Sequence, residues 1–298
     1  MQVRSKLFYS YVVFALLYAA SFMVPRSIST LHRLDLTLLQ YRLVSLTVLI
    51  PVVLIWFAAF YGYNKLRIYS DMIKDTPDGK HVSHLTTGIM ILALGLPIAA
   101  LIGASITIII EHSPGFTAAG TIIKNYVSLV FPLLGFIFIS LGSRGLSILS
   151  KKRPSYRSIN ILAGIFIAVG VTYCYLILTS SNLDATYHLP TWLIIVTLVC
   201  PYLYTWYLGM LAVLETHLYS RKAPGKLYRS TWNMLATGIG GIIIMQIAVQ
   251  YISTATVQLS NLKLARLLFI VYVLLALLSV GYILVAIGAK RLQKIEEV

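Results

Sequence analysis

Charged residues are scarce in this sequence. Only 11% of the 298 residues are Asp, Glu, Lys or Arg, whereas 58% are hydrophobic and the mean hydropathy is +0.84. Soluble domains contain about a quarter charged residues. A soluble core of this size could not bury so much apolar surface, so the composition predicts an integral membrane protein that has the lipid bilayer as its solvent.

The apolar residues gather in eight runs, each long enough to cross a bilayer as an α-helix, which takes about 17–25 residues. Backbone groups in lipid must satisfy their own hydrogen bonds, so each run is predicted to be helical. A membrane β-barrel needs segments of about ten alternating residues, and these runs are too long and too evenly apolar. The runs are residues 7–25, 43–64, 86–110, 125–147, 159–180, 190–214, 231–252 and 267–289.

The predicted fold class is therefore an all-α bundle of eight transmembrane helices joined by short loops. We expect residues 1–298 to form a single transmembrane domain with no soluble domain. The first run has no small-x-small cleavage site before Pro25, so it is expected to be a retained span and not a removed signal peptide.

Basic residues outnumber acidic ones, and the net charge is +15. Loops on one side of the predicted spans hold eighteen of the 24 Lys and Arg residues, and those on the other side hold six. The positive-inside rule then predicts a cell membrane protein with both termini in the cytoplasm. The basic loops are expected to meet anionic lipid. Because these residues are dispersed over five short segments, we expect no nucleic-acid binding.

Ionisable side chains are missing from the middles of all eight runs, which contain no Asp, Glu, Lys, Arg or His. Such groups usually mark proton relays and ion-coupled transport. Their absence argues against an intramembrane protease of the paired-aspartate or His-Glu metal type. A retinal protein would need a mid-membrane Lys, which the last run lacks. We therefore predict no enzymatic activity and no cofactor.

Cysteine and histidine are also few. Cys174 and Cys200 both lie inside apolar runs, where cysteine behaves as a small hydrophobic residue. The best metal candidate on the outer face combines Glu111, His112 and His188. We favour the alternative that these histidines simply lie at the membrane interface, so no metal site is predicted.

Uncharged polar residues offer the best candidate for a ligand site. Pro201 lies within the run 190–214 and has no N–H, which leaves the carbonyl near Thr197 without its helical partner. Hydroxyl and amide side chains in the fifth, sixth and seventh runs could surround that carbonyl. Equally, tyrosines near an interface form an aromatic belt, and buried hydroxyls often bond the i−4 carbonyl. The predicted ligand-binding residues are Tyr173, Thr197, Tyr204, Tyr207, Asn233, Thr237 and Gln246.

Three glycines in the seventh run, Gly238, Gly240 and Gly241, resemble a phosphate loop in composition only, because they lie inside a predicted span. We predict that they allow close helix packing.

Three functional hypotheses remain. The first is a transporter or channel for a small neutral molecule or ion, through a polar uncharged cavity between the fifth, sixth and seventh spans; the missing ionisable group weakens it. The second is a membrane receptor or sensor module that signals to a separate partner, because the chain has no output domain. The third is a non-catalytic subunit or scaffold of a larger membrane complex or a homo-oligomer.

Overall fold

The structure, a computed structural model, describes residues 38–112, 117–150, 199–256 and 264–297, together with isolated residues between 155 and 172. Within this part of the chain it is all-helical, with six long helices and no strand. The helices are α3 (Leu38–Met72), α4 (Gly79–His112), α5 (Thr117–Leu149), α9 (Cys200–Ser220), α10 (Lys226–Thr256) and α11 (Leu264–Glu296). The all-α prediction is confirmed here. The number of eight spans stays a prediction, because the run 7–25 and most of the run 159–180 lie outside the described residues.

Three helical stretches of the described chain are long and apolar enough to cross a membrane. They are Leu129–Leu149, Lys226–Ala248 and Val273–Glu296, with mean hydropathies of 1.8, 1.3 and 2.2. An apolar helix of this length suits the hydrocarbon thickness of a bilayer. These helices fit the prediction of a membrane protein.

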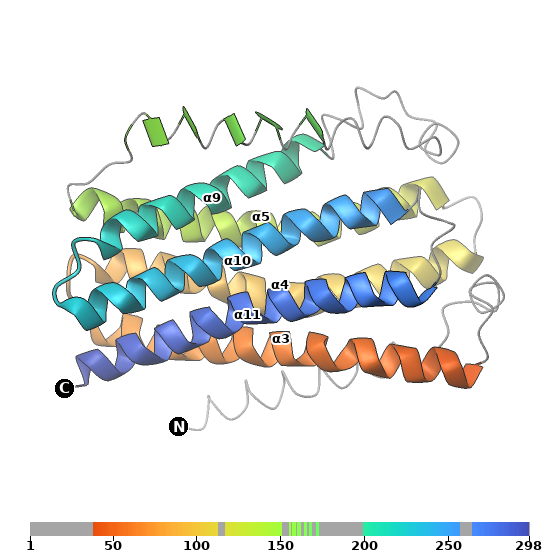
Figure 1. Cartoon of the computed structure of the whole chain (residues 1–298), viewed down its shortest axis with the longest axis horizontal. Helices are drawn as coiled ribbons and strands as arrows, with labels where there is room; N and C mark the ends of the chain where they lie inside the picture. Colours follow the sequence, from red (N-terminus) through yellow and green to blue (C-terminus); the bar gives the residue numbers. More distant parts are fainter. Residues whose placement is uncertain are drawn as a thin grey trace.

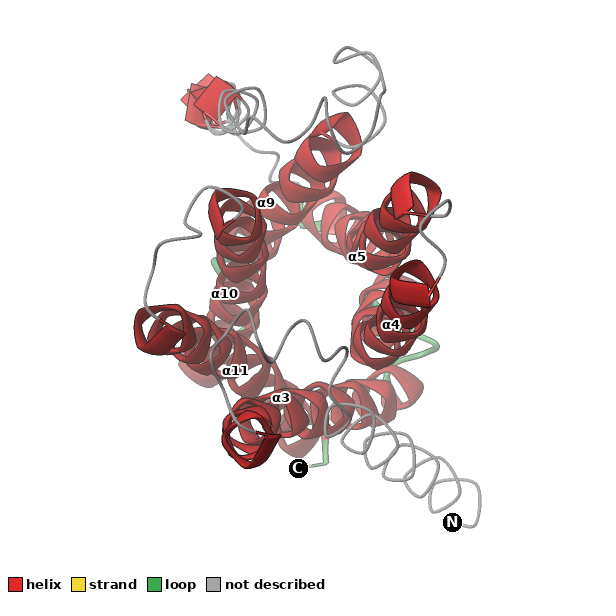
Figure 2. Ribbon diagram, turned by 90° about the vertical axis from the view of Figure 1, so that its right-hand side faces the viewer, coloured by secondary structure: helices red, strands yellow, loops and turns green. Residues whose placement is uncertain are grey.

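The six helices are arranged as a ring in chain order (Figure 2). Each one packs against the next, and α11 returns to pack against α3. Their long axes run roughly alongside one another (Figure 1). The turns 73–78 and 221–225 and the end of α11 all lie at the same end of the bundle, on the left of Figure 1.

We call this the basic end, because the described Lys and Arg side chains gather near it. It is the end at which α3, α5, α9 and α11 finish and at which α4 and α10 begin. Within the turn 221–225, Gly225 has a φ of 75°, a left-handed conformation that glycine adopts without steric cost. The basic residues are Lys65, Arg67, Lys74, Lys80, Arg144, Arg221, Lys222, Lys226, Arg229, Lys290, Arg291 and Lys294.

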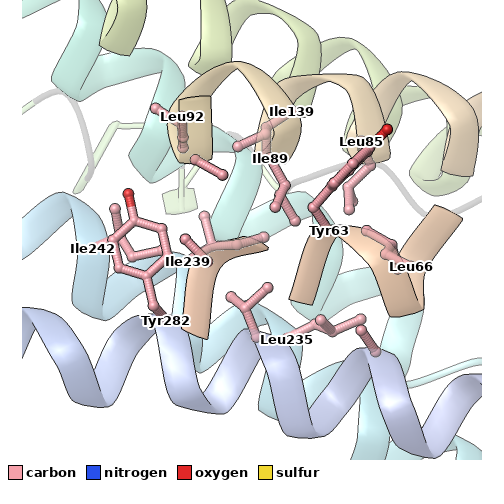
Figure 3. Packing of buried hydrophobic residues seen from close by; sticks show 14 of the residues in the cluster. Tyr63, Leu66, Leu85, Ile89, Leu92, Ile139, Leu235, Ile239, Ile242 and Tyr282 are labelled. Atoms are coloured by element: carbon pink, nitrogen blue, oxygen red, sulfur yellow. The ribbon is translucent and has the colours of Figure 1, made fainter. Parts of the chain in front are cut away.

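One cluster of buried apolar side chains joins all six helices. Figure 3 shows Ile89 of α4 above Ile239 of α10, and Leu85 of α4 beside Tyr63 of α3. The outer faces are also apolar: Ile244 is 62% exposed on α10, and Leu141 is 51% exposed on α5. Helices with an apolar surface on both faces are typical of a membrane bundle, in which lipid covers the outside.

Glycines bring α10 and α11 close together. A Cβ added to Gly238 would come within 2.8 Å of the carbonyl oxygen of Gly281, and one added to Gly241 within 3.3 Å of the Gly281 Cα. At Gly240 the nearest atoms belong to Val213 of α9 at 3.7 Å, which is an ordinary contact. Gly238 and Gly241 thus make the close helix approach that small residues permit, whereas Gly240 leaves room for a methyl group.

Glycines also allow α4 and α5 to pack closely, and the sequence analysis does not predict this for α5. A Cβ on Gly88 would lie 2.5 Å from the carbonyl oxygen of Gly135, and one on Gly142 would lie 2.6 Å from that of His81. A side chain on Gly145 would overlap the His81 ring. Gly135 and Gly142 are seven residues apart, a spacing that keeps both on one helix face.

Candidate functional site

Polar side chains are concentrated inside the basic end of the bundle. We call this set the polar layer. Five of its members are less than 5% exposed, and so are two of its neighbours, Ser147 and Ser220. The five are Tyr69, Ser143, Glu215, Thr216 and Trp232. The layer consists of Tyr69, Asp78, Ser143, Glu215, Thr216, Tyr219, Tyr228, Trp232 and Asn233.

Two hydrogen bonds of this layer connect helices that are not neighbours in the ring. The Tyr219 hydroxyl of α9 donates to Oδ2 of Asp78, which precedes α4, at 2.6 Å. Tyr69 of α3 is hydrogen-bonded to Tyr228 of α10. Trp232 packs edge-on against Tyr219, with ring centroids 4.9 Å apart. Side chains therefore bridge the interior of the ring at its basic end.

Tyr219 and Tyr69, two of the three bridging tyrosines, stay neutral. Burial, and then the hydrogen bond to Asp78, raises the pKa of Tyr219. Burial, followed by the influence of Tyr228, raises the pKa of Tyr69. Their hydroxyls therefore act as hydrogen-bonding groups, not as proton acceptors or donors in exchange with solvent.

Ser143 and Thr216 join α5 to α9 through a hydrogen bond of 2.9 Å between their hydroxyls. Thr216 donates its own proton to the Ala212 carbonyl at 2.7 Å. A hydroxyl has one proton, so Ser143 must be the donor in the bond between the two side chains. Both hydroxyl protons are thus already used.

Glu215 lies beside this pair and is only 4% exposed. Its Oε2 has no hydrogen-bond partner among the described residues. Burial raises the pKa of the Glu215 carboxyl to about 7, against the opposing effect of the exposed Arg144 on α5. Because buried carboxylates are normally paired, an unpartnered one is a feature that needs a functional explanation.

Asn233 is the predicted ligand residue that the structure places in the polar layer. Its Oδ1 lies 3.0 Å from Nδ1 of His217 and 2.5 Å from Ser220 Oγ, whose single proton is shared between this oxygen and the His217 carbonyl oxygen at 2.6 Å. An amide oxygen only accepts, so Nδ1 of His217 must carry a proton. Nε2 of the same ring lies 3.3 Å from the Arg221 Nε, which donates to it. His217 thus lies between Asn233 of α10 and the Arg221 side chain.

Tyr282 places a second unpartnered polar atom deeper in the ring. Its side chain is 1% exposed, and its hydroxyl has no hydrogen-bond partner among the described residues. Figure 3 shows the ring rising from α11 beside Ile242. At 1.5 Å per residue, Tyr282 lies about 21 Å from the end of α11 at Glu296. The Nε1 of Trp232, nearer the basic end, is also buried without a partner.

The other predicted ligand residues differ in exposure where the structure describes them. Tyr173 and Thr197 lie outside the described residues. Tyr204 is 53% exposed, and Tyr207 is half-buried. Cys200 is exposed as well, whereas Tyr202 and Trp206 are buried and so mark the inner face of α9. On α10, Thr237 is exposed and donates to the Asn233 carbonyl, and Gln246 is half-buried.

The structure adds little on metals. Glu111 and His112 belong to the last turn of α4, but their side chains lie outside the described part of the chain, as does His188. Where side chains are described, no group of three or more His, Cys, Asp or Glu residues could hold a metal ion.

The sequence analysis does not include Glu215 in the candidate site, because this residue directly follows the predicted span 190–214. The spacing of Ala212, Glu215, Thr216 and Tyr219, at i, i+3, i+4 and i+7, is the signal that could have found it. All four residues occupy one helix face, and all four are buried.

Comparison of the chain with protein-family models, with curated proteins and with solved structures gives no match. The function must therefore be inferred from the arrangement of the residues themselves.

Proposed function

We propose that the chain is a multi-pass membrane transporter of a small neutral molecule or ion, which moves through the interior of the helix ring. The observation that carries the proposal is the Tyr282 hydroxyl, buried among apolar side chains with no partner among the described residues. An unpaired buried hydroxyl costs about 1–3 kcal/mol. A passing solute or water molecule would satisfy it for part of a transport cycle.

In this proposal the chain crosses the membrane eight times, with both termini in the cytoplasm. The gathering of the described Lys and Arg side chains at the basic end supports this orientation, because cytoplasmic loops carry the excess of positive charge. The basic end would then contact the anionic lipid of the inner leaflet of a cell membrane.

The polar layer acts as the cytoplasmic closure of the path. Movement of a solute past it requires the Tyr219–Asp78 and Tyr69–Tyr228 bonds to separate. A neutral hydrogen bond contributes about 0.5–1.5 kcal/mol and one to a charged group about 1.5–3 kcal/mol. Opening therefore costs little enough to occur during turnover.

Flux measurements on the purified chain in liposomes test this function. Light scattering follows the entry of glycerol and urea, and tracer uptake follows Na⁺ and K⁺. We expect the wild type to pass at least one of these probes, and Tyr282→Phe to pass it several-fold more slowly. Thermal stability should be unchanged or raised in this variant, because it removes an unpaired buried hydroxyl.

Tyr61→Phe is the matched control. Tyr61 is 42% exposed on α3, and Lys65 lies over its ring, a contact that phenylalanine preserves. Its flux should equal that of the wild type. The proposal is wrong if no probe enters faster than into protein-free vesicles, or if both variants transport equally.

A sensor function is the second candidate, and the position of α11 favours it. Glu296, the last residue of α11, contributes to the raised pKa of Tyr69 and Tyr219, so the helix end lies near the polar layer. A change in that layer could reach the C-terminus directly. Saturable binding of a probe without flux would indicate this function, with the output in a partner subunit.

A further inference from the structure

We propose that Glu215 is the proton-binding residue of this chain and that it couples solute movement to a proton gradient. The coupling rests on the proposed transport function, whereas the proton site itself does not. Glu215 is the one charged side chain that is buried among the described residues, and the other buried polar residues there are Ser and Thr. A carboxyl group in the interior at this end can bind a cation, and the proton is the smallest cation.

The surroundings of the carboxyl favour protonation over a stable ion pair. Oε2 has no hydrogen-bond donor among the described residues. The Thr216 hydroxyl donates to Ala212 and the Ser143 hydroxyl donates to Thr216, so neither proton is directed at the carboxyl. A buried carboxylate without donors is strongly disfavoured, and binding a proton neutralises it.

Ionisable groups on the adjacent helices leave the carboxyl free to titrate. On α5 the group that acts on it is Arg144, which is exposed and only partly offsets burial, so the pKa stands at about 7. On α9 itself, His217 is hydrogen-bonded to Asn233 and Tyr219 to Asp78.

On α10 the ionisable residues nearest the basic end are Lys226, Tyr228 and Arg229. Tyr228 is hydrogen-bonded to Tyr69, and both basic side chains are exposed. None of these groups forms a fixed partner for Glu215.

The chemical step is a simple proton exchange. An O–H bond forms when the carboxylate takes a proton from water on one side of the membrane. The same bond breaks when the proton is released to water on the other side, and nothing is oxidised or reduced. Near neutral pH both forms are populated, which suits a group that must bind and release in each cycle.

The first part of the test detects the proton site without a substrate. Infrared difference spectra of the full chain in liposomes are recorded while the pH is raised from acidic to alkaline. We expect a protonated-carboxyl band that titrates near neutrality, disappears in Glu215→Gln and persists in Glu297→Gln. Glu297 is an exposed carboxylate and therefore a matched control. A band that persists in Glu215→Gln overturns the assignment.

Sodium provides a second check on the ligand. The titration is repeated in NaCl and in choline chloride at equal ionic strength. An identical midpoint supports a proton site. A midpoint that moves to lower pH in NaCl means that Na⁺ competes for the carboxylate, and it overturns the assignment of the proton as the sole ligand.

The last part measures coupling with whichever of glycerol, urea, Na⁺ or K⁺ the wild type transports. Vesicles contain a pH-sensitive dye, and the probe is added outside. Proton movement that accompanies wild-type flux, and falls to the level of protein-free vesicles in Glu215→Gln, supports the proposal. Flux without proton movement overturns the coupling but leaves transport intact. A titrating Glu215 with no flux overturns both transport and coupling and retains the proton site.

Discussion

The carboxyl of Glu215 differs from every other acidic group in the described chain in being buried. Its pKa of about 7 means that the folded protein holds a proton that the unfolded chain would release near the reference pKa of 4.5. This carboxyl therefore links folding to pH, and the sign follows from proton binding. The folded state binds more protons between these two values, so the free energy of unfolding decreases as the pH rises through this range.

We predict that the wild type in mild detergent is less stable at about pH 8 than at about pH 5, by as much as ~3 kcal/mol from this residue. Glu215→Gln should remove the contribution of this residue to the pH dependence and be more stable than the wild type at the higher pH, because its neutral amide avoids the buried charge. Denaturant unfolding at both pH values measures the difference. Glu297→Gln should retain the wild-type slope, and equal slopes in the wild type and Glu215→Gln would contradict the prediction.

At the scale of the helices, glycines decide how closely neighbours approach. Gly238 of α10 faces the backbone of α11, whereas Gly240, two residues further along, faces only the Val213 side chain. The two positions share one helix and differ in what a methyl group would meet. They therefore separate the effect of packing from that of helix propensity.

We predict that Gly238→Ala destabilises the protein by about 1–3 kcal/mol, because its Cβ would press on the Gly281 carbonyl and the Val285 backbone. Gly240→Ala should be neutral or stabilising by up to about 1 kcal/mol, since alanine favours the helix and finds space. Thermal unfolding in detergent measures both. A similar change in the two variants would show that the close α10–α11 approach is not required.

At the scale of the whole molecule, the turns 73–78 and 221–225 share the basic end of the ring. Both turns should therefore lie on one side of the membrane. The positive-inside rule assigns that side to the cytoplasm. The loop 257–263, between the last two predicted spans, is expected on the opposite side.

We predict that Asp75→Cys and Pro224→Cys are protected from a membrane-impermeant maleimide in intact cells and react after permeabilisation. Ser260→Cys should react in intact cells. The unsubstituted chain measures the background from Cys174 and Cys200. Opposite behaviour of Asp75→Cys and Pro224→Cys would contradict the shared end, and joint reactivity in intact cells would reverse the orientation.

Most of the candidate site could not be predicted from the sequence. Asn233 was chosen as a polar residue and is found in the polar layer, but its partners, His217 and Ser220, come from another helix. The aromatic residues of α9 led to the prediction of a ligand site on this helix, but Tyr204 faces outward and Trp206 faces inward. A polar residue's identity is local information, whereas its partner depends on helix rotation.

Hydropathy and the distribution of charge were sufficient for the all-helical class and for helices able to cross a membrane, because backbone satisfaction in lipid and the length of an apolar run are local properties. The order of the helices around the ring, the glycine contacts and the burial of Glu215 depend on which helix faces meet. Those contacts join residues far apart in the chain, such as Ser143 with Thr216 and Tyr219 with Asp78. Only packing in three dimensions gives a carboxyl at the edge of an apolar run an environment in which a neutral form is stable near pH 7.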